Sequence, residues 1–441
     1  MIKKSEETFP KYAIIAFPKM GRSLLMTHNI AKSAVERTSK MLLDKVFANF
    51  GKVARESART LFSAVVRTGS ALVTDLAASM ERDATSKKGR QEKVSGWLGR
   101  YDYASPVCDH LWDEGVALIS RDTIIAIDSG DISKEFGGKG MEGMEMGYDA
   151  SRGVTAMGHS LLCAAVVVRK RAVPLQLSLL KGRKGLPDAE INLFDKIIAS
   201  TGDKGIIVQD RGFDSERFVS HAIQSAHRSV VRIKEMTRDV FGTGRSIDKD
   251  MMDAPCVYAI LRSPTRQVKA EVRWRKGFFP YKNSHLEILV VSSTFNGATL
   301  YLYALNFLRQ NASMKELSEA AILAANAYFC RWSVEVLFQD IKQCFRIEDA
   351  RVRTFCRLKS LLALCTLAYT YFAHVLPRCE DETKRLLKTM KDSLGEIIES
   401  FRTFVANVRE LLRMERTRFI SGRPRKHKPP DMAPYLPGLE P

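Results

Sequence analysis

Residues 123–128 read TIIAID, an unbroken apolar run that ends on a carboxylate, and residues 205–210, GIIVQD, repeat the same design. Short apolar runs bounded by turn residues are typical of buried strands, so each strand delivers an aspartate, Asp128 or Asp210, to its carboxyl end. Two β-rich runs, 158–171 and 172–180, follow the first strand closely enough to pair with it as antiparallel strands. We therefore expect a mixed α/β core.

The rest of the chain is expected to divide into parts around this core. A helical, basic N-terminal region with apolar groups at helical spacing is a candidate for binding DNA ends. A β-rich insertion is expected inside the α/β core domain, a candidate catalytic domain, and helices after that domain are candidates for dimerisation. The final segment is basic and proline-rich. The expected boundaries are 1–115 for the N-terminal domain, 116–355 for the catalytic domain, about 236–310 for the insertion, 356–420 for the C-terminal helices and 421–441 for the tail.

Composition favours a polyanionic partner. The chain has 69 Lys and Arg against 50 Asp and Glu, a net charge of +19, and cations that neutralise phosphates gain affinity by releasing counterions. The eight cysteines form no CxxC pair or Cys/His cluster, which argues against a zinc site and a disulfide framework. The apolar stretch Leu361 to Leu376 is interrupted by polar side chains and is barely long enough to cross a bilayer, so we expect a buried helix. Met1 to Pro10 has no apolar signal core, which favours a cytosolic protein.

A second pattern lies after the expected insertion. Tyr328, Arg331, Glu335 and Lys342 fall within an arc of about 60° on one predicted helix. With Asp128 and Asp210, Glu335 completes a set of three carboxylates, the ligands that two Mg²⁺ ions need for phosphoryl transfer. Arg331 and Lys342 would hold phosphate oxygens, and Tyr328 would give a hydrogen bond or a stacking surface.

These residues resemble the signature of the bacterial IS4-type insertion-sequence transposases. That family's Y-(2)-R-(3)-E-(6)-K pattern is matched in full by YFCRWSVEVLFQDIK, residues 328–342. Its two catalytic aspartates fall on Asp128 in IIAIDSGDISK and Asp210 in IIVQDRGFD, and it also has a β-rich insertion before the glutamate. The resemblance covers roughly residues 120–350 and implies an RNase H-like DDE catalytic core, flanked here by helical N-terminal and C-terminal regions.

The resemblance also implies a reaction. In cut-and-paste transposition of an insertion sequence, water frees the 3′ end of the element and that hydroxyl later attacks target DNA. A hairpin on the element end is the expected intermediate. The implied cofactor is two Mg²⁺ ions, for which Mn²⁺ can substitute. The implied partners are double-stranded DNA, as terminal inverted repeats and target, and a second copy in a synaptic complex; the implied location is the bacterial cytosol at the nucleoid, with no membrane.

Three further residues are candidate DNA contacts. Trp332 stands where some relatives carry a tryptophan at the distorted DNA end, and Trp274 lies in the insertion, where relatives place an aromatic against a flipped base. Both indoles could equally be packing residues. Arg211 directly follows the second aspartate.

Other polar residues compete for the same roles. Asp131 either supports a metal ligand through a hydrogen bond, is itself a ligand, or caps a loop, and Asp214 resembles the N-cap of the helix that follows it. Asp340 lies about 140° around the helix from Glu335, outside the expected site. His159 resembles a hydrogen-bonded core residue, because this chemistry needs no histidine base.

Three alternative functions remain at this stage. A structure-specific nuclease would use the same carboxylates but stop after hydrolysis. A DNA-binding protein with a decayed catalytic core would keep the basic surface and lose turnover. A peripheral membrane protein would need a basic amphipathic helix with an aromatic face, and the sequence has none that is convincing. The sequence of the terminal repeats and the target preference cannot be read, because base readout depends on where a few side chains lie.

Overall fold

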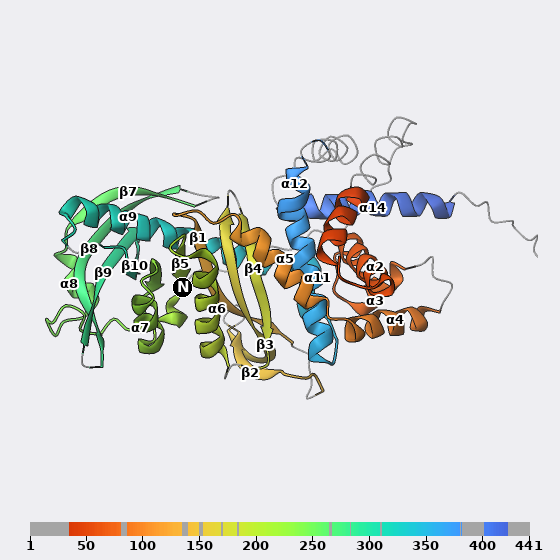
Figure 1. Cartoon of the computed structure of the whole chain (residues 1–441), viewed down its shortest axis with the longest axis horizontal. Helices are drawn as coiled ribbons and strands as arrows, with labels where there is room; N and C mark the ends of the chain where they lie inside the picture. The colour runs from red at the N-terminus through yellow and green to blue at the C-terminus, as the bar shows by residue number, and fades with distance from the viewer. Residues whose placement is uncertain are drawn as a thin grey trace, which may run out of the picture.

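The computed structural model describes residues 35–80, 86–134, 140–149, 153–168, 171–182, 185–263, 267–282, 284–308, 311–379, 381 and 401–421. Along the long axis of the molecule, a β-rich end, a central sheet with helices and a helical end follow one another (Figure 1). The predicted tail lies, apart from Ser421, outside the described residues.

The central sheet contains the strands that the sequence predicts. Strands β4, β3, β1, β5 and β6 lie side by side in that order. The first three are antiparallel to one another, whereas β5 is parallel to both β1 and β6. This mixed sheet confirms the predicted mixed α/β fold class. The bounds are β1 Ile124–Ser133, β3 Val154–Val168, β4 Arg171–Leu180, β5 Ile206–Gln209 and β6 Ser229–Arg232; β2, Glu145–Asp149, also pairs with β3.

The β-rich insertion extends this sheet. Its last strand, β10, pairs antiparallel with β6, and β9, β8 and β7 follow as antiparallel neighbours, so the sheet is continuous through all ten strands. The insertion is therefore attached to the core by backbone hydrogen bonds. The bounds are β7 Cys256–Arg262, β8 Gln267–Tyr281, β9 Ser284–Phe295 and β10 Ala298–Leu305, preceded by the short helix α8, Ile247–Met252.

Helices cover both faces of the central sheet. Ile125 and Ile127 of β1 pack into a core with α6, Leu186–Thr201, and α7, Glu216–Gln224. Ala126 belongs to the core on the opposite face, against α10, Trp332–Phe345. Because successive side chains of a strand alternate between faces, Asp128 points to the same side as Ala126. This alternation aims the first aspartate at the helix that carries Glu335.

The helical end combines segments from both ends of the chain (Figure 1). A helix at 35–46 and helices α2 to α5 pack against α11 and α14 in one hydrophobic core. Helix Phe355–Arg378, which includes α11, is long and apolar enough to cross a membrane, but 78% of its apolar window is buried inside the molecule. A helix that is apolar on all sides is stable in such a core. The bounds are α2 Lys52–Thr68, α3 Val73–Ala78, α4 Lys87–Arg100, α5 Ala104–Val116, α11 Phe355–Thr370, the π-helical turn Tyr371–Val375, α12 Leu376–Arg378 and α14 Phe401–Ser421.

Candidate active site

The two aspartates meet at one edge of the sheet. Asp128 is the fifth residue of β1, and the prediction that this strand ends at the aspartate is wrong, because pairing with β3 continues it to Ser133. Asp210 directly follows β5, as the residue before the 3-10 turn Arg211–Phe213. The register pairs Ala126 with Val208, so the parallel strands bring Asp128 and Asp210 to the same level. Parallel neighbours present their carboxyl ends at a common edge, which is where open α/β sheets place their sites.

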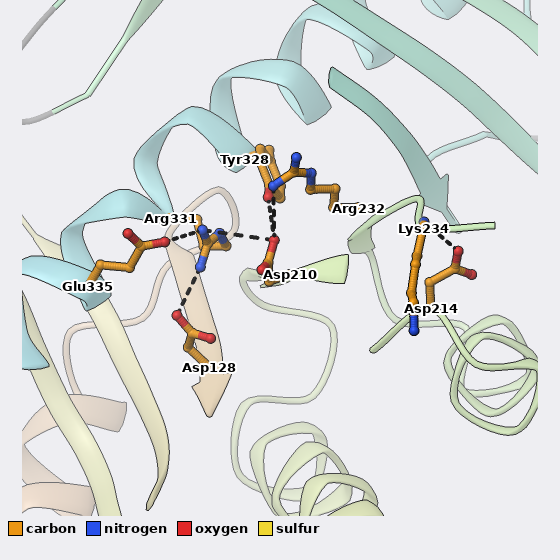
Figure 2. Close-up of polar contacts among 8 residues, drawn as sticks. All are labelled: Asp128, Asp210, Asp214, Arg232, Lys234, Tyr328, Arg331 and Glu335. Carbon is orange, nitrogen blue, oxygen red and sulfur yellow. Dashed lines mark hydrogen bonds and ion pairs between the residues drawn. The ribbon is translucent and has the colours of Figure 1, made fainter. Parts of the chain in front are cut away.

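The residues of the predicted Tyr328–Lys342 motif lie on two consecutive helices beside this edge, not on one helix. Helix α9, Met314–Cys330, ends and α10 begins at Arg331, whose backbone keeps helical angles (φ −54°, ψ −33°). The Tyr328 hydroxyl donates a hydrogen bond to Oδ1 of Asp210 over 2.8 Å, which ties the end of α9 to β5. Glu335 lies in the first turn of α10. Figure 2 shows these side chains converging from the strand ends and the helix pair.

Arg331 lies among the three carboxylates. Its Nη1 donates to Oδ2 of Asp128 over 2.9 Å, and its Nη2 contacts the Glu335 carboxylate and lies 3.9 Å from Oδ1 of Asp210. Only 6% of Arg331 is exposed, so these ion pairs are largely shielded from water. One guanidinium thus links carboxylates from two strands and a helix.

The charges of the site shift one another's protonation. The pKa of Asp128 is raised to about 7, mainly by burial and also by the carboxylates of Asp210 and Glu335, although Arg331 opposes the rise. Burial also acts to raise the pKa of Asp210, but Arg331 and hydrogen bonds from Arg211 and Tyr328 lower it overall. The pKa of Arg331 is raised by its anionic neighbours despite burial. The site therefore accumulates more negative charge than one guanidinium neutralises.

The sequence reasoning missed Arg232. This residue ends β6, and its Nη1 lies 3.6 Å from Oδ1 of Asp210 (Figure 2). Arg232 is a second cation on the Asp210 carboxylate. The β-branched run SVVRIK, residues 229–234, could have indicated this residue. Strand β6 is parallel to β5, so its carboxyl end, which carries Arg232, lies at the same edge of the sheet as the two aspartates.

Comparison with known proteins agrees with this geometry. The family model of the transposase DDE domain matches residues 119–371, which include all three carboxylates. The chain belongs to the DDE transposase family. No curated protein matches the chain. Among solved structures, the piggyBac transposase synaptic complex with hairpin DNA has 12% sequence identity and a TM-score of 0.41, over 91% of this chain and 82% of that one.

Family membership makes this protein an enzyme of DNA transposition, and DDE transposases generally use divalent metals. As the side chains lie, no group of three or more His, Cys, Asp and Glu within the described residues is arranged to hold a metal ion. The guanidinium of Arg331 is the cation that the three carboxylates contact. Their chemistry nevertheless fits Mg²⁺, which prefers carboxylate oxygens, and they already gather around a positive charge.

The other predicted DNA contacts of this transposase lie in different surroundings. Lys342 is two turns beyond Glu335 and pairs with Glu348 at 3.1 Å, away from the three carboxylates. Arg211 is exposed beside Asp210. Trp332 is 49% exposed, next to the site, whereas Trp274 is 6% exposed and packs in the core between the insertion and α9. For Trp274, this position favours the packing interpretation.

The competing carboxylates have other partners. Asp131 accepts a bond from Ser160 on the neighbouring strand, and Asp340 is buried against Arg402 and Arg171. The prediction that Asp214 caps the following helix is wrong, because the N-cap is Ser215, whose hydroxyl accepts from the Phe218 N–H.

Asp214 instead holds the chain that follows β6. Its carboxylate accepts from the backbone N–H groups of Lys234 and Glu235 and pairs with Arg238 at 2.6 Å. Figure 2 shows Asp214 beside Lys234, apart from the group formed by Asp128, Asp210 and Glu335. His159 is buried on β3 with its pKa lowered to about 4 by burial, as expected for a core residue.

Proposed function

We propose that this transposase moves an insertion sequence of the IS4 type by cut-and-paste transposition. The observation that carries the proposal is the convergence of Asp128, Asp210 and Glu335, from two strands and a helix, on a single cation. Carboxylates that repel one another remain close when one of them is protonated or when a positive charge lies between them, and here the charge is present. In the working enzyme, that charge is supplied by two Mg²⁺ ions held by these three residues, and Mn²⁺ can replace them.

The protein residues prepare the phosphoryl transfer. Bound Mg²⁺ supplies a lowered pKa for the attacking hydroxyl and charge stabilisation on the departing oxygen. Tyr328 holds Asp210 in place through its hydrogen bond. Because Arg331 contacts the same carboxylates, its present position and metal binding exclude each other. Released from them, the guanidinium can bind a DNA phosphate in a bidentate manner, and Lys342 provides a second cation further along α10.

The same proposal extends to the DNA and to assembly. The net charge of +19 favours double-stranded DNA, with the helical domain at 1–115 binding the terminal inverted repeats. Exposed Trp332 and Arg211 lie beside the carboxylates, where a distorted DNA end would enter. Two element ends must be held together, so we propose a homodimer in a synaptic complex, a hairpin intermediate, the C-terminal helices as a dimerisation region, and action at the nucleoid of the bacterial cytosol.

The deciding experiment uses purified protein, a labelled duplex that carries one inverted repeat from the DNA flanking the reading frame, and a target plasmid. Reactions with Mg²⁺, Mn²⁺ or EDTA compare the wild type with Glu335→Gln and Asp128→Asn. We expect metal-dependent cleavage at the repeat boundary and joining to the plasmid. Both activities should fall at least about 100-fold in the variants, because each loses a charged metal ligand.

Asp131→Asn is the matched control, because Asp131 lies on the same strand as Asp128 but alternates to its opposite face. It should cleave and join like the wild type. Cleavage without joining would favour a structure-specific nuclease, and DNA binding without strand breakage in any protein would leave a DNA-binding protein with an inactive core.

A further inference from the structure

Lys134 is a buried lysine beyond the active site. It follows β1, and its residue is only 4% exposed. The ammonium group donates to three backbone carbonyls, those of Ile347 at 2.7 Å, Glu348 at 2.9 Å and Ala350 at 2.8 Å. Lysine is almost never fully buried without such partners, and these bonds use all three of its donors. Burial lowers its pKa to about 8, so the group remains protonated at neutral pH.

The three carbonyls belong to the chain that leaves α10. Helix α10 ends at Phe345, and Arg346 takes the left-handed conformation (φ 54°), which turns the chain into the 3-10 turn Ile347–Asp349. The ammonium therefore lies near the carboxyl end of α10, where the helix dipole favours a cation. Lys134 therefore joins the end of β1 to the end of α10.

These two elements carry two of the catalytic carboxylates. Asp128 is six residues before Lys134 on β1, about 20 Å at the rise of a strand, and Glu335 is twelve residues before Ile347, about 18 Å at the rise of a helix. Between these points the elements are in contact, because the backbone at Gly130 faces the ring of Phe338. The strand and the helix thus lie side by side from the catalytic edge to the Lys134 contacts.

We propose that Lys134 is a positioning residue that fixes the axial register of α10 against β1, and thereby the placement of Glu335 relative to Asp128. Apolar contacts such as that of Phe338 are non-directional and permit small slides of a helix along a sheet. Hydrogen bonds from a buried ammonium are directional and oppose such slides. Metal ligation tolerates deviations of only about 0.2 Å, so a small slide matters.

The same contacts reach a second functional residue. Glu348, whose carbonyl accepts from Lys134, pairs through its side chain with Lys342 of α10 at 3.1 Å. Fixing the turn therefore also fixes the partner of the proposed phosphate-binding lysine. This inference rests on the proposed function, because it assigns Lys134 a role only through Asp128, Glu335 and Lys342.

The test measures Mn²⁺ affinity by electron paramagnetic resonance titration of the full-length protein without DNA, alongside unfolding by guanidinium chloride. Lys134→Met removes all three donors, Lys134→Gln keeps a neutral two-donor group, and Lys134→Arg keeps the charge. The matched control is His227→Phe, which removes a buried ring bonded to the carbonyls of Lys204 and Arg228, before the amino ends of β5 and β6.

We expect Lys134→Met to lower Mn²⁺ affinity by about 10- to 100-fold, the range found when residues supporting metal ligands are removed. Lys134→Gln should fall between Lys134→Met and the wild type, and Lys134→Arg should restore most of the affinity. His227→Phe should lose stability but keep wild-type affinity. Should Lys134→Met not fold, the Gln and Arg variants still provide the comparison.

Wild-type Mn²⁺ affinity in folded Lys134→Met and Lys134→Gln would overturn the inference and leave the proposed function intact. An equal loss of affinity in His227→Phe would also overturn it, because the effect would then follow from reduced stability. If the wild type bound no Mn²⁺, or bound it undiminished in Asp128→Asn, the proposed function would fail and this inference with it.

Discussion

Arg331 and Asp128 form a buried ion pair, with Nη1 2.9 Å from Oδ2, although 203 residues separate them in the chain. The pair joins the helix junction between α9 and α10 to the middle of β1. Because Arg331 also contacts Glu335 and lies near Asp210, it is a counter-ion shared by all three carboxylates.

Replacing Arg331 with Met should separate its two roles. The variant leaves three carboxylates without their shared cation, and removing one partner of a buried ion pair costs about 3–5 kcal/mol of unfolding free energy. Because the competing guanidinium is gone, Mn²⁺ or Ca²⁺ should raise the melting temperature more in the variant than in the wild type. Differential scanning fluorimetry with and without metal measures both effects. An equal or smaller metal-induced shift would show that Arg331 does not compete with the metal.

The two tryptophans should respond in opposite ways. Trp274→Ala opens the core between the insertion and α9, so it should cost about 3–5 kcal/mol of unfolding free energy. Trp332→Ala removes a half-exposed side chain, so its unfolding free energy should stay within about 0.5 kcal/mol of the wild type. Its affinity for element-end DNA, measured by fluorescence anisotropy, should fall by about 1–3 kcal/mol if bases stack on the indole. Unchanged affinity would show that the Trp332 indole does not contact the DNA.

Replacing Lys342 should reduce the salt dependence of DNA binding. If it neutralises one phosphate, Lys342→Met lowers the slope of log affinity against log salt by about 0.9. Lys315 provides the control. It lies at the amino end of α9, its side chain is exposed, and it pairs only weakly with Glu319 at 4.0 Å. Lys315→Met should keep the wild-type slope. Equal slopes in the wild type and Lys342→Met would argue that Lys342 serves only its ion pair with Glu348.

Acid should destabilise the protein through two buried histidines. Burial lowers the pKa of both His159 and His374 to about 4, whereas an unfolded histidine has a pKa near 6.5. Between these values the unfolded chain binds protons that the folded protein cannot. The contribution of these two histidines to the unfolding free energy is therefore fully present above about pH 6.5 and is lost as the pH falls toward 4. Each histidine contributes a slope of at most about 1.4 kcal/mol per pH unit.

The variant His374→Phe tests this prediction. Because it lacks one of the two histidines, its unfolding free energy should depend less steeply on pH than that of the wild type. Guanidinium denaturation at several pH values between 7 and 5 gives the slope. The same steepness in variant and wild type would mean that other groups dominate acid unfolding.

The sequence by itself determined the strands that carry Asp128 and precede Asp210, the β-rich insertion and the DDE family signature, although it did not show that β1 continues past Asp128 to Ser133. These features are local: apolar runs, β-branched alternation and residue spacing record them within a few positions. That the two aspartates lie at the same level was shown only by the parallel pairing of β1 with β5.

Tertiary structure alone decided how these parts combine. The break at Arg331, its bridging of three carboxylates and the burial of Trp274 depend on packing between segments far apart in the chain. Arg232 and Lys134 received no role from spacing, since each acquires its partners only when β6 or the turn after α10 is brought beside it. Likewise, Asp214 looked like a helix cap until β6 placed the N–H groups of Lys234 and Glu235 against it. Hydrogen bonds and ion pairs of this kind are long-range, and a local pattern carries no record of them.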